Sequence, residues 1–168
     1  EKEKYLIETI GAKPKGISIV HNPTDVDFYD TADPSLFIEK YGVQDFILCV
    51  GRIEWRKNQL TLLHALRDSS LPIVLVGHKG DPKCSEKVVE YAGSNVLMID
   101  RLEPNSPMLA SAYAAARVYI LPSWCEGASL SALEAAATGC NMVLSDRSSE
   151  KEYFGDFARY CDPCNPNS

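Results

Sequence analysis

The stretch RVYILPSWCEGASLSALEAAATGCNMVLS, residues 117–145, contains the unit from which the rest of the chain is built. It begins with a short apolar run rich in β-branched and aromatic residues. A polar loop follows, then an Ala-rich segment with helical periodicity, and a second apolar run comes after Gly139. Glycine is a common residue just beyond the end of a helix. The pattern therefore predicts a strand, a helix over residues 129–139 and another strand.

Apolar runs of the same kind recur along the chain. Their apolarity is continuous rather than alternating, which indicates strands buried on both faces of a parallel sheet. The runs lie at residues 17–22, 46–50, 72–76, 95–99, 117–122, 141–145 and 157–161. Segments with helical spacing lie at residues 4–11, 58–68, 85–93, 106–117 and 129–139. This alternation predicts an α/β fold with a doubly wound, mostly parallel sheet and helices on both faces, a Rossmann-like arrangement.

Length and charge narrow the function classes. A chain of 168 residues is expected to form a single domain over residues 1–168. Its formal net charge of −6 argues against broad contact with nucleic acid, which needs a basic face. The apolar runs are too short to span a bilayer, and the first residues lack the apolar centre of a signal peptide. We therefore expect a cytoplasmic protein.

The cysteines predict no metal or redox centre. Three of the six, Cys49, Cys125 and Cys140, lie in or beside apolar segments, where cysteine behaves as a small hydrophobic residue. Cys161 and Cys164 form a lone CxxC pair, whereas a structural zinc site needs four ligands. Free thiols in a reducing compartment are the expectation.

Basic residues follow the apolar run at 46–50. In an open parallel sheet, ligands bind beyond the carboxyl ends of the strands, so this loop is a candidate site. Gly51 permits a sharp turn, Arg52 follows at the strand tip, and Lys57 is expected at the start of the next helix. Cations there oppose the helix dipole. The loop is either a solvated basic surface or a site for an anion.

Acidic residues follow the run at 117–122. Ser131 and Glu134 match the capping box S-x-x-E, which would explain Glu134 without a ligand. Glu126, Gly127 and Ser129 lie outside that explanation. Carboxylates accept hydrogen bonds from paired sugar hydroxyls, and loop amides donate to phosphate. Together with the basic loop, the two glutamates predict a site for a nucleotide-sugar.

Other phosphate-binding patterns are absent from the sequence. Neither GxxxxGK[ST] nor GxGxxG occurs, so P-loop ATPases and NAD-binding Rossmann units are disfavoured. No acidic pair is placed to hold Mg²⁺, and Arg52 and Lys57 would instead neutralise a departing diphosphate. Asp100 and Arg101 border the same edge, where they are either loop residues or the rim of a slot for a base.

Several motifs, in order, resemble those of the retaining group 1 glycosyltransferases. LPSWCEGASLSALEAAATGCNMVLS (121–145) is similar to the E-x7-E motif, and VGRIEWRKN (50–58) to the phosphate loop GR…K. SIVHNPTDVDFY (18–29) resembles the start of the donor-binding half, and residues 101–123 the segment that leads to the first glutamate. The resemblance covers nearly all of the chain from residue 17 onward.

This resemblance implies the C-terminal, donor-binding domain of a two-domain GT-B enzyme, with the N-terminal acceptor-binding domain and the final C-terminal helices absent from this chain. Arg52 and Lys57 would hold the donor diphosphate, Glu134 the ribose and Glu126 the transferred sugar. Backbone groups would complete the site: those of Gly127, Ala128, Ser129 and Leu130 for sugar and phosphate, Gly51 in the phosphate loop, and Arg101 and Leu102 for the base.

The family resemblance also implies a reaction. A hexosyl group would pass from a nucleotide-diphosphate sugar to an acceptor hydroxyl with retention and without a metal. The acceptor would be a glycan or lipid-linked glycan of the cell envelope, met in the cytoplasm or at the inner face of the membrane. The isolated domain is expected to be inactive alone.

One departure from the family pattern leaves alternatives open. Where the family has Gly-Phe-Gly, this chain has Gly127, Ala128 and Ser129, so the second glycine is replaced by a residue with a side chain. A non-catalytic nucleotide-sugar-binding module is one alternative. Half of a sugar-nucleotide epimerase is another, although such proteins do not usually combine this E-x7-E spacing with the GR…K loop.

Overall fold

The computed structural model describes residues 2–168, with side chains from Lys4 onward, as a layered α/β fold. The strands are β1 (Phe46–Val50), β2 (Ile73–Val76), β3 (Val96–Ile99), β4 (Ala116–Leu121), β5 (Met142–Ser145) and β6 (Arg159–Cys161). The helices are α1 (Lys2–Thr9), α2 (Val26–Asp30), α3 (Ser35–Tyr41), α4 (Gln59–Ala65), α5 (Pro82–Tyr91), α6 (Pro107–Ala115), α7 (Leu130–Ala137) and α8 (Glu150–Phe154), with the 3₁₀ helices η1 (Trp55–Lys57) and η2 (Gly155–Phe157).

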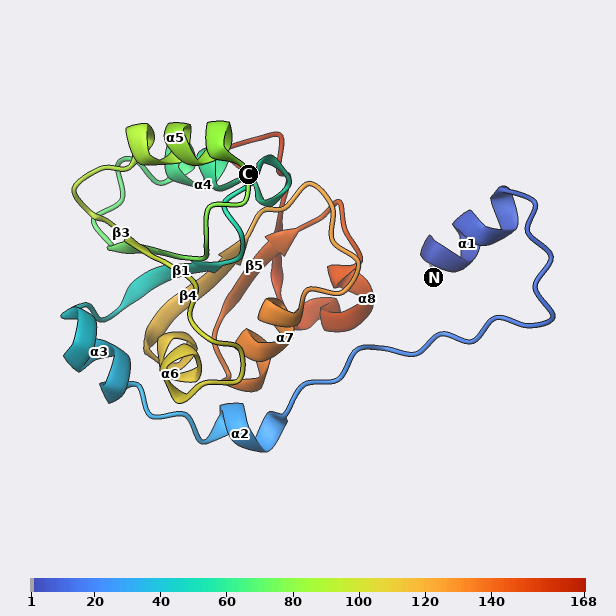
Figure 1. Cartoon of the computed structure of the whole chain (residues 1–168), viewed down its shortest axis with the longest axis horizontal. Helices are drawn as coiled ribbons and strands as arrows, with labels where there is room; N and C mark the ends of the chain where they lie inside the picture. Colours follow the sequence, from blue (N-terminus) through green and yellow to red (C-terminus); the bar gives the residue numbers. More distant parts are fainter. Residues whose placement is uncertain (1) are drawn as a thin grey trace.

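The described strands form one six-stranded sheet in the order β3-β2-β1-β4-β5-β6, and every neighbouring pair is parallel. The predicted doubly wound α/β fold is confirmed. Figure 1 shows α4 and α5 together on one side of the sheet and α3, α6 and α7 on the other. The strand order reverses direction between β1 and β4, and such switch points are where open α/β sheets bind ligands.

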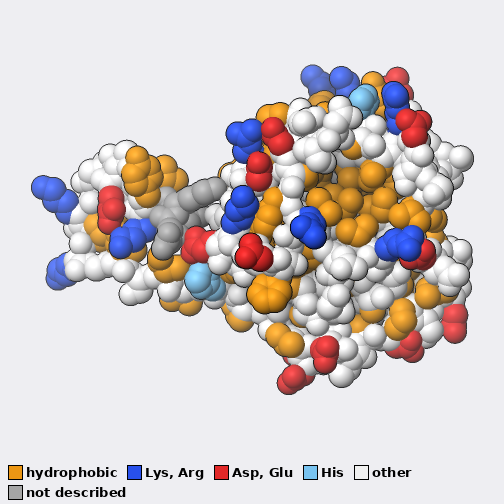
Figure 2. Space-filling view, turned by 180° about the vertical axis from the view of Figure 1, so that it is seen from behind, with side chains coloured by type: hydrophobic (Ala, Val, Ile, Leu, Met, Phe, Trp, Pro, Cys, Tyr) orange, Lys and Arg blue, Asp and Glu red, His pale blue; other side chains and the backbone are white. Residues whose placement is uncertain are grey.

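The core lies where the continuous apolar runs predicted it. The strands β1 and β2 are almost wholly buried, as expected for strands covered by helices on both faces. Large aromatic side chains fill the layer between the sheet and α3 and α6. The fully buried ones are Tyr29, Phe37, Phe46, Tyr113 and Tyr119. On the face opposite to that of Figure 1, apolar side chains gather around a hollow (Figure 2).

The strand predicted at residues 17–22 is wrong. This segment has no regular structure and runs between α1 and the sheet domain (Figure 1). Its apolar side chains stay largely exposed, Ile19 by 46% and Val20 by 86%. A strand needs a partner to satisfy its backbone groups, and the segment pairs with no strand of the described sheet. His21 instead contacts α8, at 3.1 Å from Glu152.

Candidate functional site

The loops that follow β1 and β4 lie side by side at the carboxyl edge of the sheet. They are brought together because β1 and β4 are neighbours in the sheet, although about 70 residues separate them in the sequence. The amide of Trp124 donates a hydrogen bond to the carbonyl of Arg56 across the two loops, at 2.9 Å. The basic loop and the acidic loop therefore form one surface.

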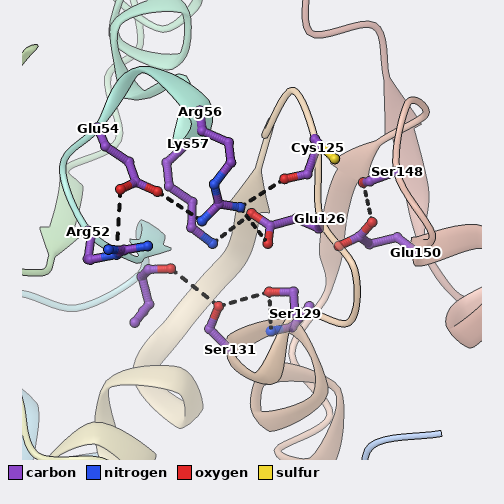
Figure 3. Close-up of polar contacts among 12 residues, drawn as sticks. Arg52, Glu54, Arg56, Lys57, Cys125, Glu126, Ser129, Ser131, Ser148 and Glu150 are labelled. Atoms are coloured by element: carbon purple, nitrogen blue, oxygen red, sulfur yellow. Dashed lines mark hydrogen bonds and ion pairs between the residues drawn. The ribbon is translucent and has the colours of Figure 1, made fainter. Parts of the chain in front are cut away.

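Lys57 and Arg56 hold Glu126 between them (Figure 3). The Lys57 ammonium donates to Glu126 Oε1 at 2.7 Å, and the Arg56 guanidinium lies 3.0 Å from Oε2. Lys57 and Glu126 are both nearly buried, at 8% and 9% exposure. Burial alone would raise the pKa of Glu126, but the charge and hydrogen bond of Lys57, with smaller contributions from Ser123 and Arg56, together lower it. Glu126 is therefore an ionised carboxylate with a fixed orientation.

The sequence predicted Lys57 at the start of the helix after β1. It lies instead in the 3₁₀ helix η1, before α4. The left-handed Asn58 separates η1 from α4, which begins at Gln59. This break turns the Lys57 side chain towards β4 and removes the conflict with the dipole of α4. Gly51 provides the space for it, because a Cβ at Gly51 would lie 3.2 Å from Lys57 Cε.

Arg52 is the accessible cation of this edge. Its side chain is 54% exposed, and Nε lies 3.5 Å from Glu54 Oε2. Glu54 also accepts a hydrogen bond from Arg56 at 2.8 Å. Glu54 thus holds two guanidinium groups on the same side of the loop, next to Lys57. The result is three cations around two carboxylates, a surface on which an anion can bind (Figure 3).

The capping box that the sequence offered as an alternative explanation of Glu134 does not form. The residue that caps α7 is Ser129, whose Oγ accepts from the amide of Ala132 at 3.4 Å. Ser131 lies inside the helix, with its hydroxyl 2.8 Å from that of Tyr119. Because the helix begins two residues earlier than the capping box requires, Glu134 is too far along α7 to reach an orphan amide.

Glu134 instead faces a cavity of about 620 Å³. Its Oε2 accepts a hydrogen bond from the buried Tyr113 hydroxyl at 2.7 Å. Burial raises the pKa of Glu134, and the hydrogen bond from Tyr113 only partly offsets this. Other residues that line the cavity include Asp25, Phe28, Pro104, Asn105 and Leu130. The cavity offers a carboxyl group, an amide and an aromatic ring, which suits a polar ring compound.

The remaining residues predicted for the site lie in two other parts of the structure. Gly127 and Ala128 line a separate cavity of about 310 Å³, which His21 and Tyr153 also border. Arg101 and Leu102 lie in the loop after β3, outside the lining of the Glu134 cavity. The Arg101 amide already donates to Asp100 Oδ1 at 2.7 Å.

Three polar residues of the site were missed or misjudged from the sequence. Arg56 was not among the residues predicted for the site, yet it pairs with Glu126. Tyr113 looked like a core aromatic, and its hydroxyl contact with Glu134 depends on α6 and α7 being adjacent. Glu150 is almost fully buried beside the acidic loop, where Ser148 donates to it, Oε1 has no partner and burial raises its pKa. In the sequence, Glu150 belongs to the charged segment EKE (150–152), which gave no indication that its side chain would be buried.

Among the described residues, no three His, Cys, Asp or Glu side chains are grouped closely enough to hold a metal ion. All six cysteines lie within this part of the chain and are free. None of the helices in residues 2–168 has the length and apolarity needed to cross a membrane. That the reaction needs no metal stays a prediction.

The sheet order and the site can now be compared with those of known families. The family model described as "Glycosyl transferases group 1" matches residues 37–168. The chain belongs to this family.

Curated relatives are longer than this chain. The D-inositol 3-phosphate glycosyltransferase of Frankia alni is 30% identical over 164 residues, which cover 86% of this chain and 40% of the relative. The O-antigen chain mannosyltransferase B of Escherichia coli is 31% identical over 136 residues, or 75% of this chain and 35% of the relative. The chain thus spans less than half the length of these proteins.

Solved structures share the fold. The sucrose-phosphate synthase of Thermosynechococcus elongatus superposes with a TM-score of 0.82 at 24% identity, over 99% of this chain and 44% of that protein. Anabaena Alr3699/HepE, solved in complex with UDP-glucose, gives 0.83 at 16% identity, over 98% and 48%. The fold is the Rossmann-like domain of GT-B glycosyltransferases, as predicted.

Proposed function

We propose that this chain is the donor-binding half of a retaining glycosyltransferase that moves a hexosyl group from a nucleotide-diphosphate sugar to an acceptor hydroxyl. The observation that carries the proposal is the contrast between the two carboxylates of the loop and helix that follow β4. Glu126 lies among cations, whereas Glu134 faces a cavity of about 620 Å³ and caps nothing. A ligand with a diphosphate between two hydroxylated rings matches this distribution of charge.

The cations of the β1 loop would neutralise the diphosphate. Lys57 has three N–H donors and gives one of them to Glu126, so others remain for phosphate oxygens. Arg52 is exposed enough to approach the ligand from the other side of the loop. As the bond to the sugar breaks, negative charge gathers on the departing diphosphate, and fixed cations stabilise that charge.

The carboxylates would orient the two rings. Glu126 is held in place by Lys57 and Arg56 and can accept hydrogen bonds from hydroxyls of the transferred sugar. Glu134 would accept from the ribose hydroxyls, with Tyr113 fixing its rotamer. Backbone amides over residues 127–130 would donate to sugar and phosphate. Ser129 fits this loop because its hydroxyl caps α7, a position at which glycine is only slightly less favourable.

The wider activity is part of the same proposal. One relative is named as a glycosyltransferase acting on an inositol phosphate and another as a mannosyltransferase of O-antigen chains. These names support hexosyl transfer to a hydroxyl and a role in cell-envelope glycans. The acceptor would be a glycan or lipid-linked glycan bound by a second domain, at the inner face of the membrane. This domain alone would bind the donor without turnover, and no metal would be required.

Calorimetric titration with UDP, GDP and ADP tests the proposal. We expect saturable binding of one nucleotide, weakened in Glu134→Ala because the ribose loses its acceptor. Glu90→Ala, which removes an exposed carboxylate on α5, is the matched control and should bind as the wild type does. Absence of binding by all three nucleotides, in this chain and in the full-length protein, would refute a donor site.

A further inference from the structure

A third cavity opens beside the cation cluster and is lined by both tryptophans of the chain. Its volume is about 570 Å³, and its lining includes Trp55 from η1 and Trp124 from the loop after β4. The amide of Trp124 is bonded to the carbonyl of Arg56, so the two aromatic residues are held on adjoining loops. A cavity of this size has room for one or two sugar rings.

The two indole rings are unusually open to solvent. Trp55 is 47% exposed and Trp124 is 46% exposed. Among the described residues, neither indole N–H donates a hydrogen bond, so each ring offers an apolar face together with a vacant donor. The Lys87 ammonium lies over the Trp55 ring at 5.7 Å and helps to fix it. Large aromatic residues exposed in pairs around a hollow mark binding surfaces.

A buried amide of the same cavity lacks a partner. Gln59 also lines the cavity and is only 1% exposed; its Nε2 donates to the carbonyl of Arg52 at 2.8 Å. Its Oε1 is buried and has no hydrogen-bond partner. That oxygen is closed off from solvent and has no partner among the described residues, so the polar groups that the cavity presents to a ligand are the two vacant indole donors. Leu60 and Cys84 supply the apolar remainder.

Arg56 joins this cavity to the donor site. It lines the cavity, and its guanidinium contacts Glu126 at 3.0 Å and donates to the carbonyl of Cys125 at 2.8 Å. A molecule in the cavity would therefore lie one side chain away from the carboxylate assigned to the transferred sugar. A compound that reacts with the donor sugar belongs at such a distance.

We propose that Trp55 and Trp124 form a subsite for one pyranose ring of the glycan acceptor, in addition to the contacts that the second domain would make with it. The C–H face of a pyranose packs on an indole ring, while its hydroxyls can accept from the indole N–H groups. The role as acceptor subsite rests on the proposed function, but the binding of a glycan by this cavity does not.

Tryptophan fluorescence tests the subsite directly, because the chain contains two tryptophans and both lie in the cavity. The 168-residue chain is titrated with mannobiose, maltotriose and chitobiose at millimolar concentration, and separately with uridine. At least one glycan is expected to change the emission in a saturable way. No saturable change with any of the three glycans would overturn the proposal, as would saturation by uridine alone, which would make the cavity a base pocket.

Variants locate the effect. Trp124→Ala should weaken glycan binding, read by calorimetry, by roughly tenfold, the factor expected for loss of one anchoring aromatic contact. Trp124→Phe should restore part of it. Phe157→Ala removes an aromatic side chain that is 94% exposed and lies outside the cavity lining, and should bind as the wild type does. Undiminished glycan binding in both Trp55→Ala and Trp124→Ala would overturn the subsite.

Nucleotide titration of the same preparation separates the two proposals. Nucleotide binding without glycan binding would leave the donor site standing and remove the subsite. Glycan binding that depends on the tryptophans, without nucleotide binding here or in the full-length protein, would retain a glycan site and remove the proposed function.

Discussion

Glu126 and Glu134 are eight positions apart, and both are largely buried, yet their environments are opposite. Glu126 is surrounded by Lys57 and Arg56, which lower its pKa despite burial. Glu134 has a tyrosine hydroxyl as its partner and no cation, so burial raises its pKa. The comparison teaches that burial raises the pKa of a carboxyl group where no opposite charge is buried with it. The site therefore contains one carboxylate held by cations, Glu126, and one held only by a hydrogen bond from a hydroxyl group, Glu134.

The largest effect is expected from a substitution that removes the ion pair between Lys57 and Glu126. Lys57→Met would leave Glu126 buried with only the half-exposed Arg56 as its ion-pair partner. We expect a loss of about 3 kcal/mol in the free energy of unfolding, the lower end of the range for a broken buried pair, measured by urea denaturation. Lys83→Met, an exposed lysine on α5, is the control. A loss below about 1 kcal/mol would place the pair among ordinary surface ion pairs.

Replacing each carboxylate in turn should weaken the binding of different ligands, because Glu134 is assigned to the ribose and Glu126 to the transferred sugar. Glu134→Ala is expected to weaken a nucleoside diphosphate and its sugar conjugate alike, by roughly tenfold, because ribose is present in both. Glu126→Ala should spare the bare nucleotide and weaken only the conjugate. Calorimetry with UDP and UDP-glucose, or the pair whose base binds, measures both. Equal losses for both ligands in both variants would contradict the assigned roles.

Substitutions at the N-terminus of α7 test whether Ser129 or Glu134 caps this helix. Ser129→Ala removes the cap and should cost about 1 kcal/mol of stability, whereas Ser129→Gly, which restores the residue typical of the family, should cost only a few tenths. Glu134→Gln should cost no stability, because Glu134 caps nothing. Thermal denaturation followed by circular dichroism gives all three values. A cost for Glu134→Gln as large as that for Ser129→Ala would reinstate the capping box.

The smallest effects are those of pH. Glu126 has a lowered folded pKa, so its contribution to stability is present above the ordinary value of 4.5 and is lost as the pH falls below it. Glu134 has a raised folded pKa, so stability falls as the pH rises through 4.5 towards that pKa. At neutral pH, Glu134→Gln should therefore stabilise the fold by under about 1 kcal/mol. Glu126→Gln leaves Lys57 buried without its carboxylate and should destabilise the fold by about 3 kcal/mol, as Lys57→Met does.

Urea denaturation at pH 7 and at pH 4 measures these changes. The two variants should differ in sign at pH 7, and both differences from the wild type should shrink at pH 4, where the carboxylates begin to take up protons. Changes of the same sign at pH 7 would show that the cations do not distinguish the two sites.

Much of the fold was predictable because it depends on local composition. Continuous apolar runs placed β1 to β6, and helical spacing placed α4 to α7, within a few residues. The exception, residues 17–22, is equally apolar, but a strand forms only where a sheet edge accepts it, and nothing in the local sequence states whether an edge is free. The same limit applies to the cap of α7, where Ser129 and Ser131 both suit the N-cap and only the packing of Ser131 against Tyr119 decides between them.

The sequence by itself determined the order of strands and helices, the two loops at which a ligand can bind, and the charges those loops carry. Only the tertiary structure decided which charges meet. Lys57 and Glu126 are 69 residues apart, and Tyr113 and Glu134 are 21 apart. Their contacts exist because β1 lies beside β4 and α6 beside α7. Neighbour relations of this kind follow from the packing of whole layers, which is why no local pattern contains them.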